Sequence, residues 1–481
     1  MMTSDCNQFD MIKEALHLSN VVINNVSHEE EEGISRIVVD LRPTDDVINC
    51  CPHCGNICDY YDTPRPNDPP KTWRSLDFAN KVVVLKHKPH RVLCPTHGVV
   101  TAYVPWAYPH ACFTRAFDQQ AVWLTTHMSK SAVSNYLRIT WGAIGRCISR
   151  VKKDFEPDSS ERLNGLVRIG IDENAYGRGH NKFIMIVVNH DTNEVVWAKE
   201  GRSKEVIASF FESLTEVQRS TIELVSADGA EWIHDVVKQY CPNAKICIDT
   251  FHVFEWITEA QNAVRLQEYR KKTQEIKKLK EEKKEIKESS DDFSRAQLSA
   301  IVGELNVQLN EANADAALIK SSFHLFNMNN ENLSNEDQLR LNRLVATSPV
   351  LARVSSRVAL FRDIVHTNDL NSVEGELDCW IGWAMRSRLD PFKKLAQTLK
   401  RFRDPILNTI KFGLNNARVE ANNNIIKALI RRSYGFSNVQ NLIDLIMIVC
   451  SRRYIVLPDR GLGEKGKSRW RVYRTNQFVA A

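Results

Sequence analysis

The sequence lacks any apolar run long enough to cross a membrane. Along its 481 residues, no window reaches the roughly 18 apolar residues that a transmembrane helix requires. The best candidate, Leu442 to Cys450, is short and contains Asp444. The segment from Met1 to Leu16 carries three acidic side chains and has no apolar centre of the kind found in signal peptides. These absences predict a soluble, intracellular protein.

The sequence also lacks a strong excess of either charge. Lys and Arg number 64 against 59 Asp and Glu, and this net charge of +5 does not by itself indicate a nucleic-acid partner. The excess is local, because the stretch Arg452–Arg474 holds eight basic residues against Asp459 and Glu464. That stretch is either a phosphate-contacting tail or a merely solvated one. With 43% hydrophobic and 26% charged residues, wholesale disorder is excluded.

Cysteine, in contrast, is plentiful, with 12 residues in the chain. Inside a cell such cysteines rarely form a disulfide framework, so metal sites are the first expectation. Two knuckles provide four ligands with the spacing of a closed, tetrahedral, structural zinc site: Cys51, Cys54, Cys94 and His97. The alternative is a set of unpaired buried thiols. Three neighbours compete as ligands: Cys50, His53 and Cys58.

A segment between Ser129 and Arg146 predicts two short helices. Ser131 and Thr140 are natural N-caps. Each helix has a small apolar face, formed by Val133, Leu137 and Ile144. The second helix exposes basic residues: Arg146, Arg150, Lys152 and Lys153. The pattern is that of a helix-turn-helix with its second helix in a DNA major groove, the alternative being an ordinary helical hairpin.

A strand-rich region follows. Strands are predicted at 167–172, 183–188, 194–198, 221–225 and 245–249, with helices at 204–217 and 232–240. This order matches a mixed α/β sheet of the ribonuclease-H type. The chain then reads as one long helix from 254 to about 309, with 16 charged residues in the 24 from Arg265 to Glu288, which predicts a solvated or coiled helix. More helical sequence continues to about residue 403.

Three carboxylates stand out in this region. Asp172 and Asp228 end the first and fourth predicted strands, which are neighbours in a ribonuclease-H order. A single Asp at a strand end is usually a turn former or helix cap, but two at adjacent positions are harder to explain by chance. Glu420 shares one helical face with Asn424, Lys427 and Arg431, opposite Ile425, Ala428 and Leu429.

Such carboxylates can hold two Mg²⁺ ions, because magnesium prefers hard oxygen ligands, and two ions promote in-line displacement at phosphorus. Cationic side chains near these acids would offset the repulsion between the carboxylates and the DNA phosphates. The candidates are Arg178, His180, Lys182, Lys427, Arg431 and Arg432. Asp249 and His252 lie between these elements. Either Asp249 caps the next helix while Phe251 and Phe254 pack in the core, or Asp249 and His252 neighbour the active site.

These motifs together resemble bacterial insertion-sequence transposases of the ISL3 family, in the DDE class. The shared segments run from about residue 50 to 450: CPHCG and CPTHG, Trp73-Arg-Ser-Leu-Asp77 between them, GIDE at 170–173 with Gly179-His180, SADG at 226–229, DTFHV at 249–253, and VEANNNIIKALIRRSYGFSN at 419–438. The resemblance implies a DDE triad of Asp172, Asp228 and Glu420. Glu374 and Glu376 are the reserve acids for the third position.

The resemblance implies a multidomain α/β protein whose ribonuclease-H-like core is interrupted by an all-helical insertion, in keeping with the 192 residues from Asp228 to Glu420. The expected segments are a zinc-binding β domain at 1–110, the helix-turn-helix at 111–160, the DDE catalytic domain at 161–255 and 401–457, the helical insertion at 256–400, and a basic tail at 458–481.

The implied activity is DNA transposition. The expected partners are the terminal inverted repeats of the element and the target DNA, with Mg²⁺ or Mn²⁺, structural Zn²⁺, and a homodimer or larger assembly acting in the bacterial cytoplasm at the nucleoid. The expected phosphate contacts are Arg146, Arg150, Lys153, Arg178, His180, Lys427, Arg431 and Arg432, with Asn424 beside the active site. Two alternatives stay open: a non-catalytic DNA-binding regulator derived from a transposase, and a structure-specific nuclease of the same fold.

Overall fold

The computed structural model describes residues 8–31, 33–63, 65, 67–156, 158–178, 182–288, 294–327, 333–367, 369–414, 416–436 and 438–451. The chain divides into two compact units. Unit 1 comprises Met1–Gly165, Glu173–Val206 and Val419–Ala481, and unit 2 comprises Leu166–Asp172 and Ile207–Arg418. The basic stretch from Arg452 onward, including the predicted tail at 458–481, lies outside the described residues.

Unit 1 begins with α1 (Gln8–Ala15) and two small sheets. The first has the order β1-β2-β5-β4, and the second has the order β3-β6-β7. Their strands are β1 (Val21–Glu31), β2 (Ile34–Pro43), β3 (Asp59–Asp62), β4 (Lys71–Arg74), β5 (Val82–His87), β6 (Arg91–Cys94) and β7 (Gly98–Thr101). The sequence has strand-like patches at 35–40 and 81–85, and the structure confirms them as β2 and β5.

The charge of the acidic run that begins at Glu29 predicts a solvated turn, but its first residues belong to a strand. Glu29 and Glu30 lie in β1 and pair with Arg36 and Ser35 of β2. The interpretation as a turn was wrong because it weighed charge alone. An antiparallel pair with one solvated face accepts charged side chains on that face.

Three helices follow the sheets and confirm the predicted change to short helices. They are α2 (Arg115–His127), α3 (Lys130–Leu137) and α4 (Trp141–Phe155). Thr140 caps α4 as predicted, but α3 is capped by Ser129 rather than by Ser131. The Ser129 hydroxyl accepts a hydrogen bond from the Ala132 amide, whereas Ser131 already lies inside the first turn. Arg138 ends α3 in the left-handed conformation.

The central sheet has five strands in the order β10-β9-β8-β11-β12. Its strands are β8 (Arg168–Ala175), β9 (Phe183–Asn189), β10 (Glu194–Glu200), β11 (Leu224–Ala227) and β12 (Lys245–Ile248), and β8 follows the short 3-10 helix η1 (Ser159–Leu163). β10 pairs antiparallel with β9, whereas β11 pairs in parallel with both β8 and β12. All five predicted strands are present, although β11 begins three residues later than expected.

Short helices connect these strands. The helix predicted at 204–217 is divided into α5 (Lys204–Glu212) and α6 (Glu216–Ser220), because Thr215 starts a new helix with a capping box to Gln218. The helix predicted at 232–240 is α7 (Glu231–Tyr240). This capping box is a local signal for a new helix. The apolar periodicity alone had predicted one uninterrupted helix.

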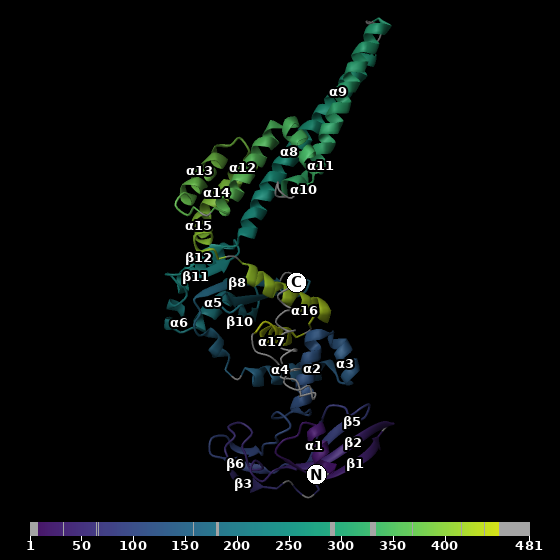
Figure 1. Ribbon diagram of the computed structural model, residues 1–481, viewed down its shortest axis with the longest axis vertical. Coiled ribbons are helices and arrows are strands. Elements are labelled where there is room, and N and C mark those ends of the chain that lie inside the picture. The colour runs from purple at the N-terminus through teal and green to yellow at the C-terminus, as the bar shows by residue number, and fades with distance from the viewer. Residues whose placement is uncertain are drawn as a thin grey trace, which may run out of the picture. The chain divides into compact units, whose positions relative to one another are not determined.

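The remainder of unit 2 is helical. The single long helix predicted from 254 is instead a pair, α8 (Thr250–Glu288) and α9 (Arg295–Ser321), which run side by side in Figure 1. The other helices are α10 (Phe323–Asn327), α11 (Asn335–Thr347), α12 (Pro349–Val365), α13 (Val373–Arg386), α14 (Asp390–Arg401) and α15 (Arg403–Phe412). Trp380, Phe361 and Phe392 are fully buried in the core that these helices share.

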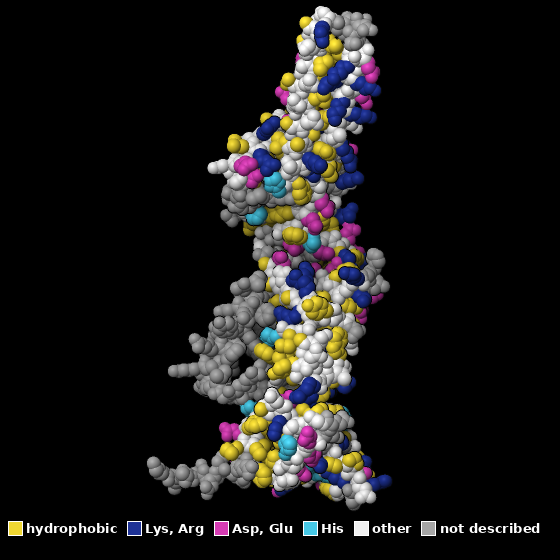
Figure 2. Space-filling model, turned by 90° about the vertical axis from the view of Figure 1, so that its right-hand side faces the viewer, with side chains coloured by type: hydrophobic (Ala, Val, Ile, Leu, Met, Phe, Trp, Pro, Cys, Tyr) yellow, Lys and Arg dark blue, Asp and Glu magenta, His cyan; other side chains and the backbone are white. Residues whose placement is uncertain are grey.

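The sparse apolar residues of α8 are explained by this pairing. Lys277 and Lys284 form i, i+4 ion pairs with Glu281 and Glu288 on the solvated side. Figure 2 shows Lys and Arg side chains gathered over this pair of helices. The prediction of a charged, solvated helix is confirmed, but its partner is α9.

Two helices complete unit 1: α16 (Ala417–Ser433) and α17 (Val439–Val449). α17 is the apolar segment noted in the sequence, and it packs against α4 and β10. Within the described part of the chain, no helix is both long enough and apolar enough to span a membrane.

Candidate functional site

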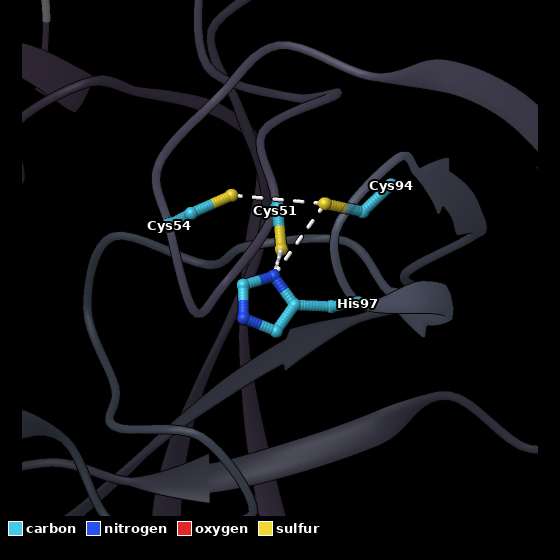
Figure 3. A group of neighbouring side chains, drawn as sticks. All are labelled: Cys51, Cys54, Cys94 and His97. Atoms are coloured by element: carbon cyan, nitrogen blue, oxygen red, sulfur yellow. Dashed lines mark hydrogen bonds between the residues drawn. The ribbon is translucent and has the colours of Figure 1, made fainter.

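The four predicted zinc ligands lie together in unit 1. Cys51 and Cys54 come from the turn before β3, Cys94 ends β6, and His97 precedes β7 (Figure 3). Their ligand atoms all lie within 4.8 Å of one another. Among the residues that the structure describes, this is the only such gathering of three or more His, Cys, Asp or Glu side chains.

The distances between these ligand atoms fit a tetrahedral metal site. The sulfur atoms of Cys54 and Cys94 are 3.6 Å apart, and Nδ1 of His97 lies 3.6 Å from Cys51 and 3.5 Å from Cys94. Zn–S and Zn–N bonds of about 2.3 and 2.0 Å in a tetrahedron give S···S and S···N edges of about 3.8 and 3.5 Å. Three thiols and an imidazole therefore fit Zn²⁺ in both chemistry and size.

The competing ligands lie outside this group. Burial raises the pKa of the Cys58 thiol to about 11, and its sulfur donates to the Asn56 carbonyl 3.3 Å away. Burial also raises the pKa of Cys94, but hydrogen bonds from His97 outweigh that effect and lower it to about 6. The ring of His53 lies 5.1 Å from that of His97. The geometry thus gathers the four predicted ligands and leaves Cys58 and His53 outside the group.

The helix-turn-helix segment has a buried ion pair at its centre. Arg150 of α4 donates two hydrogen bonds to Asp118 of α2, at 2.6 and 2.8 Å, and Asp118 is fully buried. Burial opposes the charge on Arg150, but the bonds to Asp118 outweigh it and raise the pKa of the guanidinium. Removing one partner of such a pair costs about 3–5 kcal/mol.

Arg150 therefore holds α4 against α2 and is not displayed as a free cation. Arg146 and Lys153 are exposed on the same helix, while Lys152 faces Glu156 at 3.6 Å. Val133, Leu137 and Ile144 are buried as expected.

Two of the predicted acids align at one edge of the central sheet in unit 2. The parallel register pairs Ser226 of β11 with Gly170 of β8. Two residues further on, Asp172 lies in β8 and Asp228 directly follows the last residue of β11, so a continued register would bring the two acids level on one face of the sheet. Asp172 was expected at the end of β8, but this strand continues past it to Ala175.

Asp249 joins this edge through β12. Ala227 pairs with Ile248, so the next residues, Asp228 and Asp249, are again level. One Asp249 oxygen accepts from the Phe251 amide at 3.0 Å and caps α8, as one of the two interpretations expected. The core position expected for Phe251 was wrong, since its side chain is 68% exposed. His252 lies 3.2 Å from Glu255, one turn along α8.

The side-chain amide of Asn416, which the sequence did not single out, lies at this edge. Asn416 accepts a hydrogen bond from the Ser226 hydroxyl at 2.7 Å and approaches Asp249 at 3.4 Å through its amide nitrogen. Asn416 is 190 residues from Ser226. No local signal in the sequence links the two.

Ala230 and His234, which the sequence did not single out, hold the loop after Asp228. Asp228 accepts from the Ala230 amide at 3.0 Å, and Nε2 of buried His234 donates to the Asp228 carbonyl at 3.0 Å. Burial lowers the pKa of His234, which favours its neutral form. A Cβ on Gly229 would lie 2.5 Å from the Trp256 indole, so only glycine fits this loop without a shift. These contacts fix the position of the Asp228 side chain.

Glu420 lies in unit 1, in the first turn of α16. Glu420, Asn424, Lys427 and Arg431 are all exposed, which confirms the predicted polar face. The buried stripe is centred on Ile426 rather than on Ile425, and it includes Val419, Asn422, Asn423, Leu429 and Ser433.

Two asparagines of the α16 motif have structural partners in unit 1. Asn423 accepts from the amide of buried Asn174 at 2.6 Å, and Asn422 donates to Asn193 at 3.1 Å. Their amides hold α16 against β8 and against the turn between β9 and β10. Asparagine is a poor helix former, and these contacts give a structural reason for two of the asparagines in α16.

The remaining predicted residues are placed as follows. Arg178 is exposed, His180 lies outside the described residues, and Arg432 donates a hydrogen bond to the Thr126 carbonyl. The reserve acid Glu374 is paired with Arg403 at 2.8 Å and Lys411 at 3.5 Å, and the bond from Arg403 lowers its pKa. The assignments of catalytic and DNA-contacting residues stay predictions.

Known proteins resemble this chain over nearly its whole length. Residues 169–446 match a family described as transposase, of the ISL3 group in the DDE class. Residues 103–151 match the helix-turn-helix domain of transposase family ISL3.

Individual relatives agree with these matches. The transposases for insertion sequence element IS1557 from two strains of Mycobacterium tuberculosis are each 33% identical over 447 residues, covering 91% of this chain and 94% of theirs. The transposase for insertion sequence element IS1001 from Bordetella parapertussis is 24% identical over 86% of this chain and 91% of its own. The helix-turn-helix, the α/β sheet and these matches agree: the chain belongs to the ISL3 family of insertion-sequence transposases.

Proposed function

We propose that this transposase binds the terminal inverted repeats of its own insertion sequence and catalyses metal-dependent DNA cleavage and strand transfer at the element ends. The observation that carries the proposal is the alignment of Asp172 with Asp228 on adjacent parallel strands, in a chain of a DDE family. The strand order β10-β9-β8-β11-β12, with its antiparallel and parallel halves, supports a ribonuclease-H-like core.

The carboxylates fit divalent cations. Asp172 and Asp228 present hard oxygen donors side by side, the chemistry that Mg²⁺ or Mn²⁺ prefers, and Glu420 is proposed as the third ligand. Two bound ions would supply activation of the attacking oxygen and stabilisation of the leaving oxygen. His234 and Gly229 hold the Asp228 loop in place, and Asn416 orients Asp249 beside it.

Recognition of the DNA end is assigned to unit 1. The exposed Arg146 and Lys153 of α4 would meet the duplex, and the exposed Lys427 and Arg431 of α16 would contact phosphates near Glu420. Cys51, Cys54, Cys94 and His97 would hold a structural Zn²⁺, since four protein ligands leave no open position for chemistry. The ion would tie the turn before β3 to β6 and β7.

Two element ends must be held together during transposition, so we expect a dimer or larger assembly on DNA. The charged pair α8 and α9 is the proposed interface. Light scattering of the protein on an end duplex should give at least twice the monomer mass. A sharp monomeric mass would contradict this proposal.

The proposed activity is tested with a labelled duplex that carries one element end, incubated with target DNA and Mg²⁺. Cleavage at the end followed by joined products is expected, and chelation of the metal should remove both. Binding without cutting would favour the regulator. Cutting without joining would favour a structure-specific nuclease.

A further inference from the structure

A cavity of about 520 Å³ lies in unit 1 where three helices begin. Lys130 is the first residue of α3, Trp141 is the first residue of α4, and Asn438 caps α17. All three line the cavity, together with Arg146 and Asn441. The cavity therefore joins the helix-turn-helix to the helix that follows α16.

The charged side chains known to line this cavity are positive. No Asp or Glu is found among the described residues of its lining. Lys130 is only 5% exposed, and within the described parts of the chain neither its side chain nor that of Arg146 forms a hydrogen bond or an ion pair. The Lys130 ammonium faces the ring of Phe436 at 5.7 Å. Arg150 also lines the cavity, but Asp118 neutralises it.

The Lys130 side chain is largely buried, which lowers its pKa and makes its charge unfavourable without a counter-ion. A bound anion would remove that cost. The helices add to the same preference, because each N-terminus carries a partial positive charge and backbone amides without helical partners. α3, α4 and α17 have 8, 15 and 11 residues, and their N-terminal ends all reach the cavity.

We propose that this cavity binds a phosphate of the DNA backbone, with Lys130 and Arg146 as its cationic partners. The inference rests on the proposed function, which supplies the DNA. The cavity is larger than one phosphate group and leaves room for the adjoining sugar, beside a Trp141 side chain that is 46% exposed. A phosphate held here would fix the start of α4 on the duplex, since backbone contacts set the register of a recognition helix.

The contact would also bind the duplex to α17. α4 and α17 are so close that a Cβ on Gly145 would lie 2.6 Å from the Asn441 amide, so the two walls of the cavity are in contact. A DNA phosphate bound between them would contact both the helix-turn-helix and α17, the helix that follows α16 with Glu420.

The test compares full-length wild-type protein with Lys130→Met, Lys130→Arg and Arg146→Met in binding to an end duplex over a range of salt concentrations. Lys238→Met is the matched control, because Lys238 is an exposed lysine on α7 in unit 2. Loss of one phosphate contact should raise Kd by about three- to tenfold and reduce the slope of log K against log salt by about 1. Lys130→Arg should stay close to wild type, and so should the control.

A second measurement separates anion binding from a structural role of the lysine. Without anions, the melting temperature of Lys130→Met should equal or exceed that of wild type, because an unpaired buried charge is removed. Inorganic phosphate is then tested alone, and it should raise the melting temperature of wild type but not that of Lys130→Met. Lower stability of Lys130→Met in anion-free buffer would overturn the proposal.

Other outcomes are equally decisive. If wild type binds DNA and both Met variants bind with the same Kd and salt slope, the phosphate site is wrong while the proposed function stands. The phosphate site is also wrong if inorganic phosphate stabilises wild type but the variants bind DNA normally, which would indicate a site for free phosphate. If wild type fails to bind end DNA at all, the proposed function itself fails.

Discussion

Replacing Asp228 with Asn is expected to reduce cleavage and strand transfer by about a thousandfold or more. The substitution removes one negative ligand from the proposed metal site, and a loss of about 4 kcal/mol in transition-state stabilisation corresponds to that factor. DNA binding should stay at wild-type strength or increase, because a negative charge is removed near the phosphates. Rates of end cleavage and joining in Mg²⁺, with Kd for the same duplex, check both expectations.

The controls for this prediction come from the same region. Asp235→Asn changes an exposed acid on α7, the helix that follows Asp228, and should keep most of the activity because Asp235 is not a proposed metal ligand. Glu420→Gln should behave as Asp228→Asn does, whereas Glu376→Gln, in the exposed first turn of α13, should not. Equal cutting by wild type and Asp228→Asn would show that the catalytic assignment is wrong.

Replacing Cys94 with Ser is expected to release zinc and to unfold the segment that β3, β6 and β7 form. Binding of structural zinc contributes about 10–16 kcal/mol in small zinc domains, and that free energy is available only while all four ligands are present. Few hydrophobic residues cluster around this site: Cys51, Cys58, Val92, Cys94 and Ala102. Such a small core cannot replace the metal. The measurements are zinc content by mass spectrometry and hydrogen exchange of the β6 and β7 amides.

Cys58→Ser provides a sharp comparison, because Cys58 is a buried thiol near the site that donates to a backbone carbonyl instead. It should retain one zinc per chain and normal exchange protection. Cys112→Ser, at an exposed cysteine, should change neither readout. Release of zinc by Cys58→Ser, with retention by Cys54→Ser, would mean that the ligand set is wrong.

The local features of this chain could be predicted from its sequence. The zinc ligands come in two pairs three residues apart, and each pair is positioned by one tight turn, so only the choice among neighbouring cysteines was open. The buried residues of α3 and α4 followed from helical spacing. The first strand of the central sheet followed from alternation, and the other four from short apolar runs. The predicted N-cap of α3 was wrong by two residues, because Ser129 and Ser131 are both favourable capping residues.

Features that depend on distant contacts could not be predicted. Asn422 and Asn423 find their partners 229 and 249 residues away, so their burial had no local signal. Arg150 looked like a DNA contact because it lies on a basic helix, but its partner Asp118 is on another helix. The break between α8 and α9 had a local signal, since Ser294 begins α9 with a capping box to Gln297, but the prediction of one long helix overlooked it.

The most direct test of the proposed transposase activity is to map, at single-nucleotide resolution, the products that wild-type protein forms from a labelled element end and target DNA in Mg²⁺. We predict that the 3′ end of the element is freed at its terminal nucleotide and is then joined to the target strand. Glu420→Gln should form neither product. Tight binding of the end duplex with no cleavage, or cleavage at scattered positions without joined products, would contradict the proposed activity.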